Sequence, residues 1–257
     1  MCVAEFTKPS FFDNRLFLRK SSGISRQKVY NGALIGCFPY NHYATGMFVA
    51  TSFLWVLMRQ STDFKPTLVD GMGRKIVNLR VSVTDRCNFR CTYCMPADNV
   101  EFMDRNHLLT FEELTRIAGV VARLGINRIR LTGGEPLMRK DLPDLIRMLC
   151  TVEGIDDIAM TSNAFFLKDQ AQDLKEAGLK RLNISLDALD PVKFKHVNRR
   201  DCLEEVLAGI REAARAGFKS IKINAVAVRN FSESEIMKLI DMGRSDGFEI
   251  RFIEFMP

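Results

Sequence analysis

The feature that most constrains the fold is a regular alternation of strand-like and helix-like segments from about residue 67 onward. The strand-like segments are short and rich in β-branched residues, and the segments between them carry apolar residues at helical spacing. The predicted strands cover residues 78–84, 128–132, 157–161, 181–186, 220–228 and 249–255, and the predicted helices cover residues 111–124, 141–150, 168–177, 203–216 and 233–242. Because a helix joins each strand to the next, the strands are expected to pair in parallel.

This alternation predicts an α/β fold with the helices outside a parallel sheet. Six strands are fewer than the eight of a closed TIM barrel, so an open, partial (βα)6 TIM-type barrel fits, and so does a doubly wound sheet. In both architectures the binding site lies at the carboxyl ends of the strands. We assign residues 66–257 to this core domain and residues 1–65 to an irregular N-terminal extension.

Residues 1–65 differ in composition from the rest of the chain. They contain eight Lys or Arg and three Asp or Glu, which accounts for five of the six net positive charges. This bias predicts a targeting or disordered leader, with the mitochondrial matrix as destination and the cytoplasm as the alternative. The apolar stretch at 47–58 is shorter than the about 20 residues of a membrane span, although a membrane-associated helix is a further alternative. The nearly balanced remainder predicts no nucleic-acid partner.

Three of the seven cysteines, Cys87, Cys91 and Cys94, lie within eight residues in the loop after the first predicted strand. Crowded cysteines in an α/β sequence indicate a metal or cluster site. Three thiolates from one loop can ligate three irons of a 4Fe–4S cubane and leave the fourth iron open to a small molecule. Structural zinc is the alternative, but zinc takes four ligands and no fourth Cys or His stands near.

A second motif, Gly133-Gly134-Glu135-Pro136, follows the second predicted strand. Paired glycines at a strand end allow a ligand to approach the backbone closely, and a plain turn is the alternative interpretation. In a barrel this motif faces the same mouth as the cysteine loop.

Together the two motifs resemble the radical S-adenosylmethionine (SAM) superfamily, in which SAM chelates the open iron and yields a 5′-deoxyadenosyl radical. A narrower resemblance, over about residues 67–257, is to the GTP 3′,8-cyclase family, also called molybdenum cofactor biosynthesis protein A. The matching stretches are DGMGR at 70–74, LRVSVTDRCNFRCTYCMP at 79–96, IRLTGGEPLMR at 129–139, NISLD at 183–187 and IRFIEFMP at 250–257. The implied lyase reaction converts GTP to (8S)-3′,8-cyclo-7,8-dihydroguanosine 5′-triphosphate, the first step of molybdenum cofactor (molybdopterin) biosynthesis.

The resemblance also implies roles for individual residues. Cys87, Cys91 and Cys94 match the ligands of the 4Fe–4S cluster. The positions that match SAM contacts are Tyr93, Gly134, Ser185 and Met256, and those that match GTP contacts are Arg80, Arg130, Thr161 and Lys222. The basic members of the last set also make chemical sense, because a triphosphate needs several cations and guanidinium groups suit bidentate phosphate contacts.

Two departures from the family pattern limit what the resemblance implies. Family members continue into a C-terminal region with three cysteines for a second cluster and a Gly-Gly tail, so we expect this sequence to be the front part of a longer protein and weak or inactive in cyclisation alone. Ala164 stands where the family has a glycine, at a position where a positive φ is expected.

The expected partners are GTP, an electron donor for the cluster, and cyclic pyranopterin monophosphate synthase downstream, with a homodimer possible. Two alternative functions stay open. One is another radical SAM enzyme, peptide-modifying or activating, which would not need cations at Arg80, Arg130 and Lys222. The other is a truncated, non-catalytic cluster-binding remnant.

Overall fold

Six parallel strands form one sheet in which every strand pairs with its neighbours in the chain. The computed structural model describes residues 2–3, 19–20 and 67–255. The order of the sheet is β3-β4-β5-β6-β7-β8, with all pairs parallel. The strands are β3 (Asn78–Ser82), β4 (Arg128–Thr132), β5 (Asp157–Ser162), β6 (Arg181–Ser185), β7 (Ile221–Ala227) and β8 (Glu249–Glu254). This sequential order is that of a partial barrel and not that of a doubly wound sheet, whose strand order reverses.

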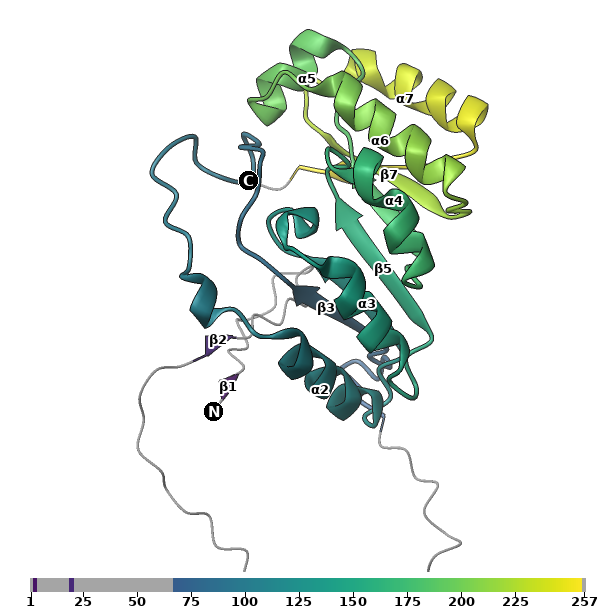
Figure 1. Ribbon diagram of the computed structural model, residues 1–257. Coiled ribbons are helices and arrows are strands. Elements are labelled where there is room, and N and C mark those ends of the chain that lie inside the picture. The colour runs from purple at the N-terminus through teal and green to yellow at the C-terminus, as the bar shows by residue number, and fades with distance from the viewer. Residues whose placement is uncertain (1, 4–18, 21–66, 256–257) are drawn as a thin grey trace, which may run out of the picture.

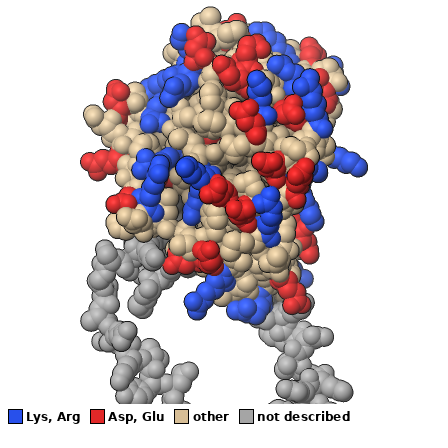
Figure 2. All heavy atoms as spheres, in the orientation of Figure 1, with Lys and Arg blue, Asp and Glu red and all other residues tan. Residues whose placement is uncertain are grey.

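The helices connect consecutive strands and gather on one side of the sheet (Figure 1). They are α2 (Phe111–Ala122), α3 (Leu142–Cys150), α4 (Leu167–Glu176), α5 (Pro191–Asn198), α6 (Leu203–Arg215) and α7 (Glu233–Asp246), with short 3-10 turns η1 (Arg105–His107) and η2 (Pro136–Met138). The five predicted helices are confirmed to within four residues at each end. Basic and acidic side chains are interspersed over the face seen in Figure 2.

Local signals explain why α2 was predictable and α5 was not. The Thr110 hydroxyl accepts from the Glu113 N–H at 3.2 Å, and the Glu113 carboxylate accepts from the Thr110 N–H at 2.9 Å, a capping box that fixes the start of α2. Helix α5 has only two buried apolar side chains, Phe194 and Val197, so it lacks a clear apolar stripe. The one sequence signal that α5 did carry was the pair Asp190-Pro191, an N-cap followed by proline at the first helical position.

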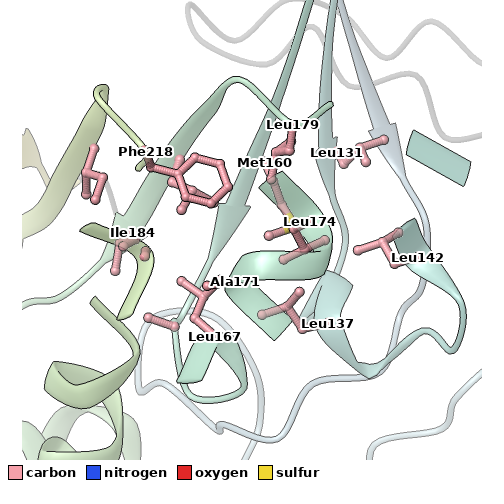
Figure 3. Packing of buried hydrophobic residues seen from close by; sticks show 14 of the residues in the cluster. Leu131, Leu137, Leu142, Met160, Leu167, Ala171, Leu174, Leu179, Ile184 and Phe218 are labelled. Atoms are coloured by element: carbon pink, nitrogen blue, oxygen red, sulfur yellow. The ribbon is translucent and has the colours of Figure 1, made fainter. Parts of the chain in front are cut away.

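The core lies between the sheet and the helices and leaves the other sheet face polar. Ile129, Leu131 and Met160 are at most 1% exposed and pack among helix side chains, as Figure 3 shows for Leu131 and Met160. Side chains alternate between the two faces of a strand, so Arg128 and Arg130 point away from this core. The sheet therefore has one apolar, helix-covered face and one polar face, which we call the inner face.

The edges of the described structure differ from its centre. β8 pairs with β7, and its side chains are largely exposed, including Phe252 at 40% and Ile253 at 44%. In the extension, β1 (Cys2–Val3) and β2 (Arg19–Lys20) form an antiparallel pair. The rest of the predicted leader and Met256 lie outside the described residues. Within the described residues, no helix is both long and apolar enough to cross a membrane.

Candidate active site

The cysteine motif lies in the loop that follows β3, at the carboxyl end of the sheet. Cys87 and Cys91 are partly buried, and Cys94 is exposed. Phe89, at 4% exposure, anchors the loop by packing edge-on against Phe194 of α5, with ring centroids 6.1 Å apart. The loop thus holds two thiols against the protein and leaves the third exposed.

The two glycines of the second motif allow the β4 loop to approach the cysteine loop. A Cβ on Gly133 would lie 2.3 Å from the Thr84 carbonyl oxygen, and one on Gly134 would lie 2.2 Å from that of Arg86. The backbone N–H of Gly134 donates to the Thr84 carbonyl at 2.7 Å. The sequence predicted that these glycines allow a ligand to approach the backbone. In the structure they allow two backbone segments of the protein to meet next to Cys87.

Glu135 ties this motif to the loop after β5. Its carboxylate, 1% exposed, accepts hydrogen bonds from the Ser162 hydroxyl at 2.8 Å, the Asn163 N–H at 2.7 Å and the Leu137 N–H at 3.1 Å. Burial raises the pKa of Glu135 to about 7 despite these three donors. In the same loop Ala164 has a φ of 64°, the left-handed conformation expected for the glycine of the family.

Tyr93, between the second and third cysteines, is fixed by an aspartate that sequence reasoning missed. Its hydroxyl donates to Asp187 Oδ2 at 2.6 Å, and Asp187 Oδ1 accepts from the Val226 N–H at 2.7 Å. Asp187 is 3% exposed, and burial raises its pKa while the bond from Tyr93 lowers it. The only sequence signal for this role was its place in NISLD. The carboxylate joins the cysteine loop to the ends of β6 and β7.

The residues predicted to bind GTP all belong to the inner face, because the strand register aligns them. Arg80, Arg130, Ala159 and Arg181 form one row of paired positions across four strands. Thr161 and Lys222 belong to the next row, two residues nearer the carboxyl ends, and Ser185 belongs to the row beyond. The structure thus brings together on one sheet face five of the SAM- and GTP-matching positions that the sequence scatters over some 140 residues.

The first row borders a basic cavity of about 370 Å³, whose lining includes Arg80, Arg128, Arg130 and Arg181. Burial lowers the pKa of Arg130, and so does repulsion from Arg80, Arg181 and Arg251. Arg181 pairs with Asp157, so part of this charge is compensated within the chain. Sequence reasoning missed Arg128, Arg181 and Arg251, although their spacing of two from other inner-face residues was a usable signal.

Lys222 has a partner in the structure. Its ammonium nitrogen lies 2.6 Å from Glu249 Oε2, and Arg251 contacts the other oxygen of Glu249 at 2.7 Å. An anionic ligand would therefore compete with Glu249 for Lys222, whereas Arg80 and Arg130 make no ion pair within the described part of the chain.

The three thiols suit an iron–sulfur cluster better than a single metal ion. A structural zinc ion takes four ligands, and among residues 67–255 no three Cys, His, Asp or Glu side chains, the three cysteines included, are arranged to hold one ion. A cubane spreads its ligands over three irons and does not need that convergence. Burial raises the pKa of Cys87, and it raises that of Cys91 to about 12, with a smaller contribution from Asp187. Both remain thiols at neutral pH until a metal displaces the proton.

Comparison with known proteins identifies the superfamily of the chain. The model of the Radical SAM superfamily matches residues 81–243, which is more than half of the chain. The chain belongs to the radical SAM superfamily. SuiB from Streptococcus suis, solved with bound S-adenosylmethionine, superposes with a TM-score of 0.62 at 16% identity, covering 85% of this chain and 48% of SuiB, which shows the shared fold.

Two similar curated proteins carry a narrower name. The protein named GTP 3′,8-cyclase from Rhodopirellula baltica is 52% identical over 191 residues, which is 74% of this radical SAM chain and 53% of that protein. The protein of the same name from Peptoclostridium acidaminophilum is 46% identical over 195 residues, 76% of this chain and 60% of that protein. The chain thus spans between about half and three fifths of the length of these relatives.

Proposed function

We propose that this chain binds a 4Fe–4S cluster, SAM and GTP and performs the GTP 3′,8-cyclase reaction, forming (8S)-3′,8-cyclo-7,8-dihydroguanosine 5′-triphosphate. Two kinds of evidence support the proposal. The relatives with that name are about half identical to this chain over three quarters of its length. The inner face also gathers Arg80, Arg130 and Arg181 in one row, and such a group of cations suits a triphosphate ligand.

In this proposal Cys87, Cys91 and Cys94 hold the cluster. When bound, the cluster and SAM supply a 5′-deoxyadenosyl radical that takes the ribose 3′ hydrogen of GTP. The chain's own residues position the reactants. Tyr93 is held at the mouth by Asp187, Gly134 keeps its backbone against the cysteine loop, and Ser185 lies at the carboxyl end of β6.

The observation that carries the substrate assignment is the row formed by Arg80, Arg130 and Arg181. Like charges brought together on partly buried strands repel one another, and this repulsion adds to the effect of burial in lowering the pKa of Arg130. A polyanion relieves this repulsion and accepts bidentate guanidinium hydrogen bonds, so the row stabilises a bound triphosphate more than a neutral ligand.

The test is equilibrium binding of GTP to the full chain after anaerobic reconstitution. Arg130→Glu should weaken binding by more than tenfold, because a charge-assisted hydrogen bond contributes about 1.5–3 kcal/mol. Arg147→Glu is the matched control: Arg147 is on α3, on the helix side, and its side chain is 54% exposed and paired with Asp144. Equal affinities of the two variants for GTP would refute the substrate assignment.

The same preparation separates the alternatives when SAM and reductant are added. GTP binding together with 5′-deoxyadenosine supports the binding part of the proposal. Cyclised nucleotide supports all of it and would overturn the expectation that this sequence is weak or inactive in cyclisation alone. Release of 5′-deoxyadenosine without GTP binding would indicate another radical SAM enzyme, peptide-modifying or activating. Iron binding without cleavage of SAM would indicate a non-catalytic cluster-binding protein.

The cellular side of the proposal includes an electron donor, cyclic pyranopterin monophosphate synthase as the consumer of the product, and a homodimer. We also propose import into the mitochondrial matrix, directed by residues 1–65, for which the support is the basic composition of that segment. A fluorescent reporter fused to residues 1–65 tests this, and a cytosolic reporter would refute it.

A further inference from the structure

The end of α5 holds the cysteine loop through the backbone. The N–H of Arg90 donates to the Asn198 carbonyl at 3.2 Å, and the N–H of Thr92 donates to the Val197 carbonyl at 2.9 Å. Both donors flank Cys91, and their acceptors lie more than 100 residues along the chain. The contact therefore places the last turn of α5 beside the central cysteine of the motif.

The side chain of Asn198 continues this contact to the sulfur itself. It is 5% exposed, and its Oδ1 accepts a hydrogen bond from Cys91 Sγ at 3.1 Å. Its Nδ2 donates to the Phe194 carbonyl at 3.2 Å, which orients the amide. Within the described residues, one other hydrogen bond reaches a sulfur of the motif, and it comes from the backbone: the Phe89 N–H donates to Cys87 Sγ at 3.4 Å.

We propose that Asn198 is a positioning residue that holds the Cys91 sulfur for cluster assembly and, through a hydrogen bond to that sulfur, favours the reduced cluster. The inference rests on the cluster of the proposed function and does not depend on GTP. Hydrogen bonds from outside the ligand set orient metal ligands and tune the reduction potential of iron–sulfur clusters. Asn198 itself stands outside the cysteine and glycine motifs.

Whether Cys91 carries a proton decides which atom of the Asn198 amide can bond to its sulfur, in the iron-free chain and in the chain with a bound cluster. In the iron-free chain Cys91 carries a proton and donates it to Oδ1. When Cys91 ligates iron, this proton is released to solvent, and the sulfur can then only accept. A half-turn of the Asn198 amide presents Nδ2–H to the sulfur. This gives up the neutral bond to Phe194 and turns Oδ1 toward that carbonyl, and the charge-assisted bond to the thiolate, which is the stronger kind, offsets this cost. Such a bond offsets negative charge on the sulfur and so stabilises the reduced state.

The experiment measures iron content and midpoint potential, followed by the electron paramagnetic resonance signal of the reduced cluster, in reconstituted wild-type chain and in Asn198→Ala and Asn198→Asp. We expect the reduction equilibrium of Asn198→Ala to become less favourable by about threefold to tenfold, where tenfold is about 59 mV for one electron. Asn198→Asp, which places a carboxylate beside the sulfur, should shift it further in the same direction. Asn127→Ala is the control, since its amide donates to Asp156 at 3.1 Å at the opposite end of β4.

The outcomes separate this inference from the proposed function. A wild-type chain that binds no iron would refute both. Wild-type potential and iron content in both Asn198 variants would overturn this inference alone. A variant that loses iron while its iron-free form unfolds at the wild-type urea concentration supports the positioning role. If Asn198→Ala does not fold, the test is the midpoint potential of Asn198→Asp, which keeps the size of the side chain. A less favourable reduction than in wild type supports the inference, and an unchanged potential refutes it.

Discussion

Replacing Gly134 with alanine tests whether the two loops at the mouth must touch for the site to form. The new methyl group would lie 2.2 Å from the Arg86 carbonyl oxygen and 2.5 Å from its carbon. Cβ contacts below 3.0 Å are essentially never seen, so the loops must separate by most of an ångström. That movement pulls apart two hydrogen bonds of 2.7 Å, from the Gly134 N–H to Thr84 and from the Glu135 N–H to Arg86.

The expected loss of folding stability in Gly134→Ala follows from these contacts. Overpacking typically costs about 1–3 kcal/mol, and each hydrogen bond that leaves a buried group unsatisfied costs about 1–3 kcal/mol. Relaxation saves part of this, so Gly134→Ala should lower the free energy of unfolding by about 4 kcal/mol, a large fraction of the usual 5–15 kcal/mol. Iron content after reconstitution should fall as well, because Cys87 directly follows Arg86.

The assay is urea unfolding of the iron-free chain, with iron content measured in parallel. Gly119→Ala is the matched control, since Gly119 lies within α2 and an added Cβ meets no atom within 4 Å. Alanine there should raise the free energy of unfolding by about 0.5–1 kcal/mol. If Gly134→Ala were as stable as wild type and bound as much iron, close contact between the loops would not be what these glycines provide.

Two further predictions concern the buried carboxylates. Because the pKa of Glu135 is about 7 in the folded chain, against an ordinary value of 4.5 for a solvated glutamate, the folded state holds a proton that the unfolded state releases. The free energy of unfolding should therefore fall by about 3 kcal/mol as the pH rises from 4.5 to 7. Urea titrations should show that Glu135→Gln loses this pH dependence. The same pH dependence in wild type and variant would contradict the prediction. Tyr93→Phe leaves the buried Asp187 carboxylate without one hydrogen-bond donor, so it should lower the free energy of unfolding by about 1–3 kcal/mol. It should also weaken SAM binding, measured by equilibrium dialysis. If neither quantity changed, the hydrogen bond from Tyr93 to Asp187 would not be what holds Tyr93 in place.

The sequence alone determined the features that depend on neighbours a few residues apart. Short-range sequence patterns predict the strands, five of the helices, the capping box at Thr110 and the cysteine spacing. The reason is that capping, helical periodicity and strand alternation act over at most four or five residues. The positive φ of Ala164 was also predictable, since a glycine in the family pattern marks a backbone requirement.

The tertiary structure decided what depends on contacts between distant segments. Tyr93 meets Asp187 and Cys91 meets Asn198 across separations of 94 and 107 residues, and no local pattern encodes those distances. Arg181 joins Arg80 and Arg130 because parallel register places residues from four strands in one row. The glycine pair likewise acquires its meaning from the backbone of another loop. Sequence spacing identifies chemical groups, whereas strand register and the packing of α5 determine which of them meet.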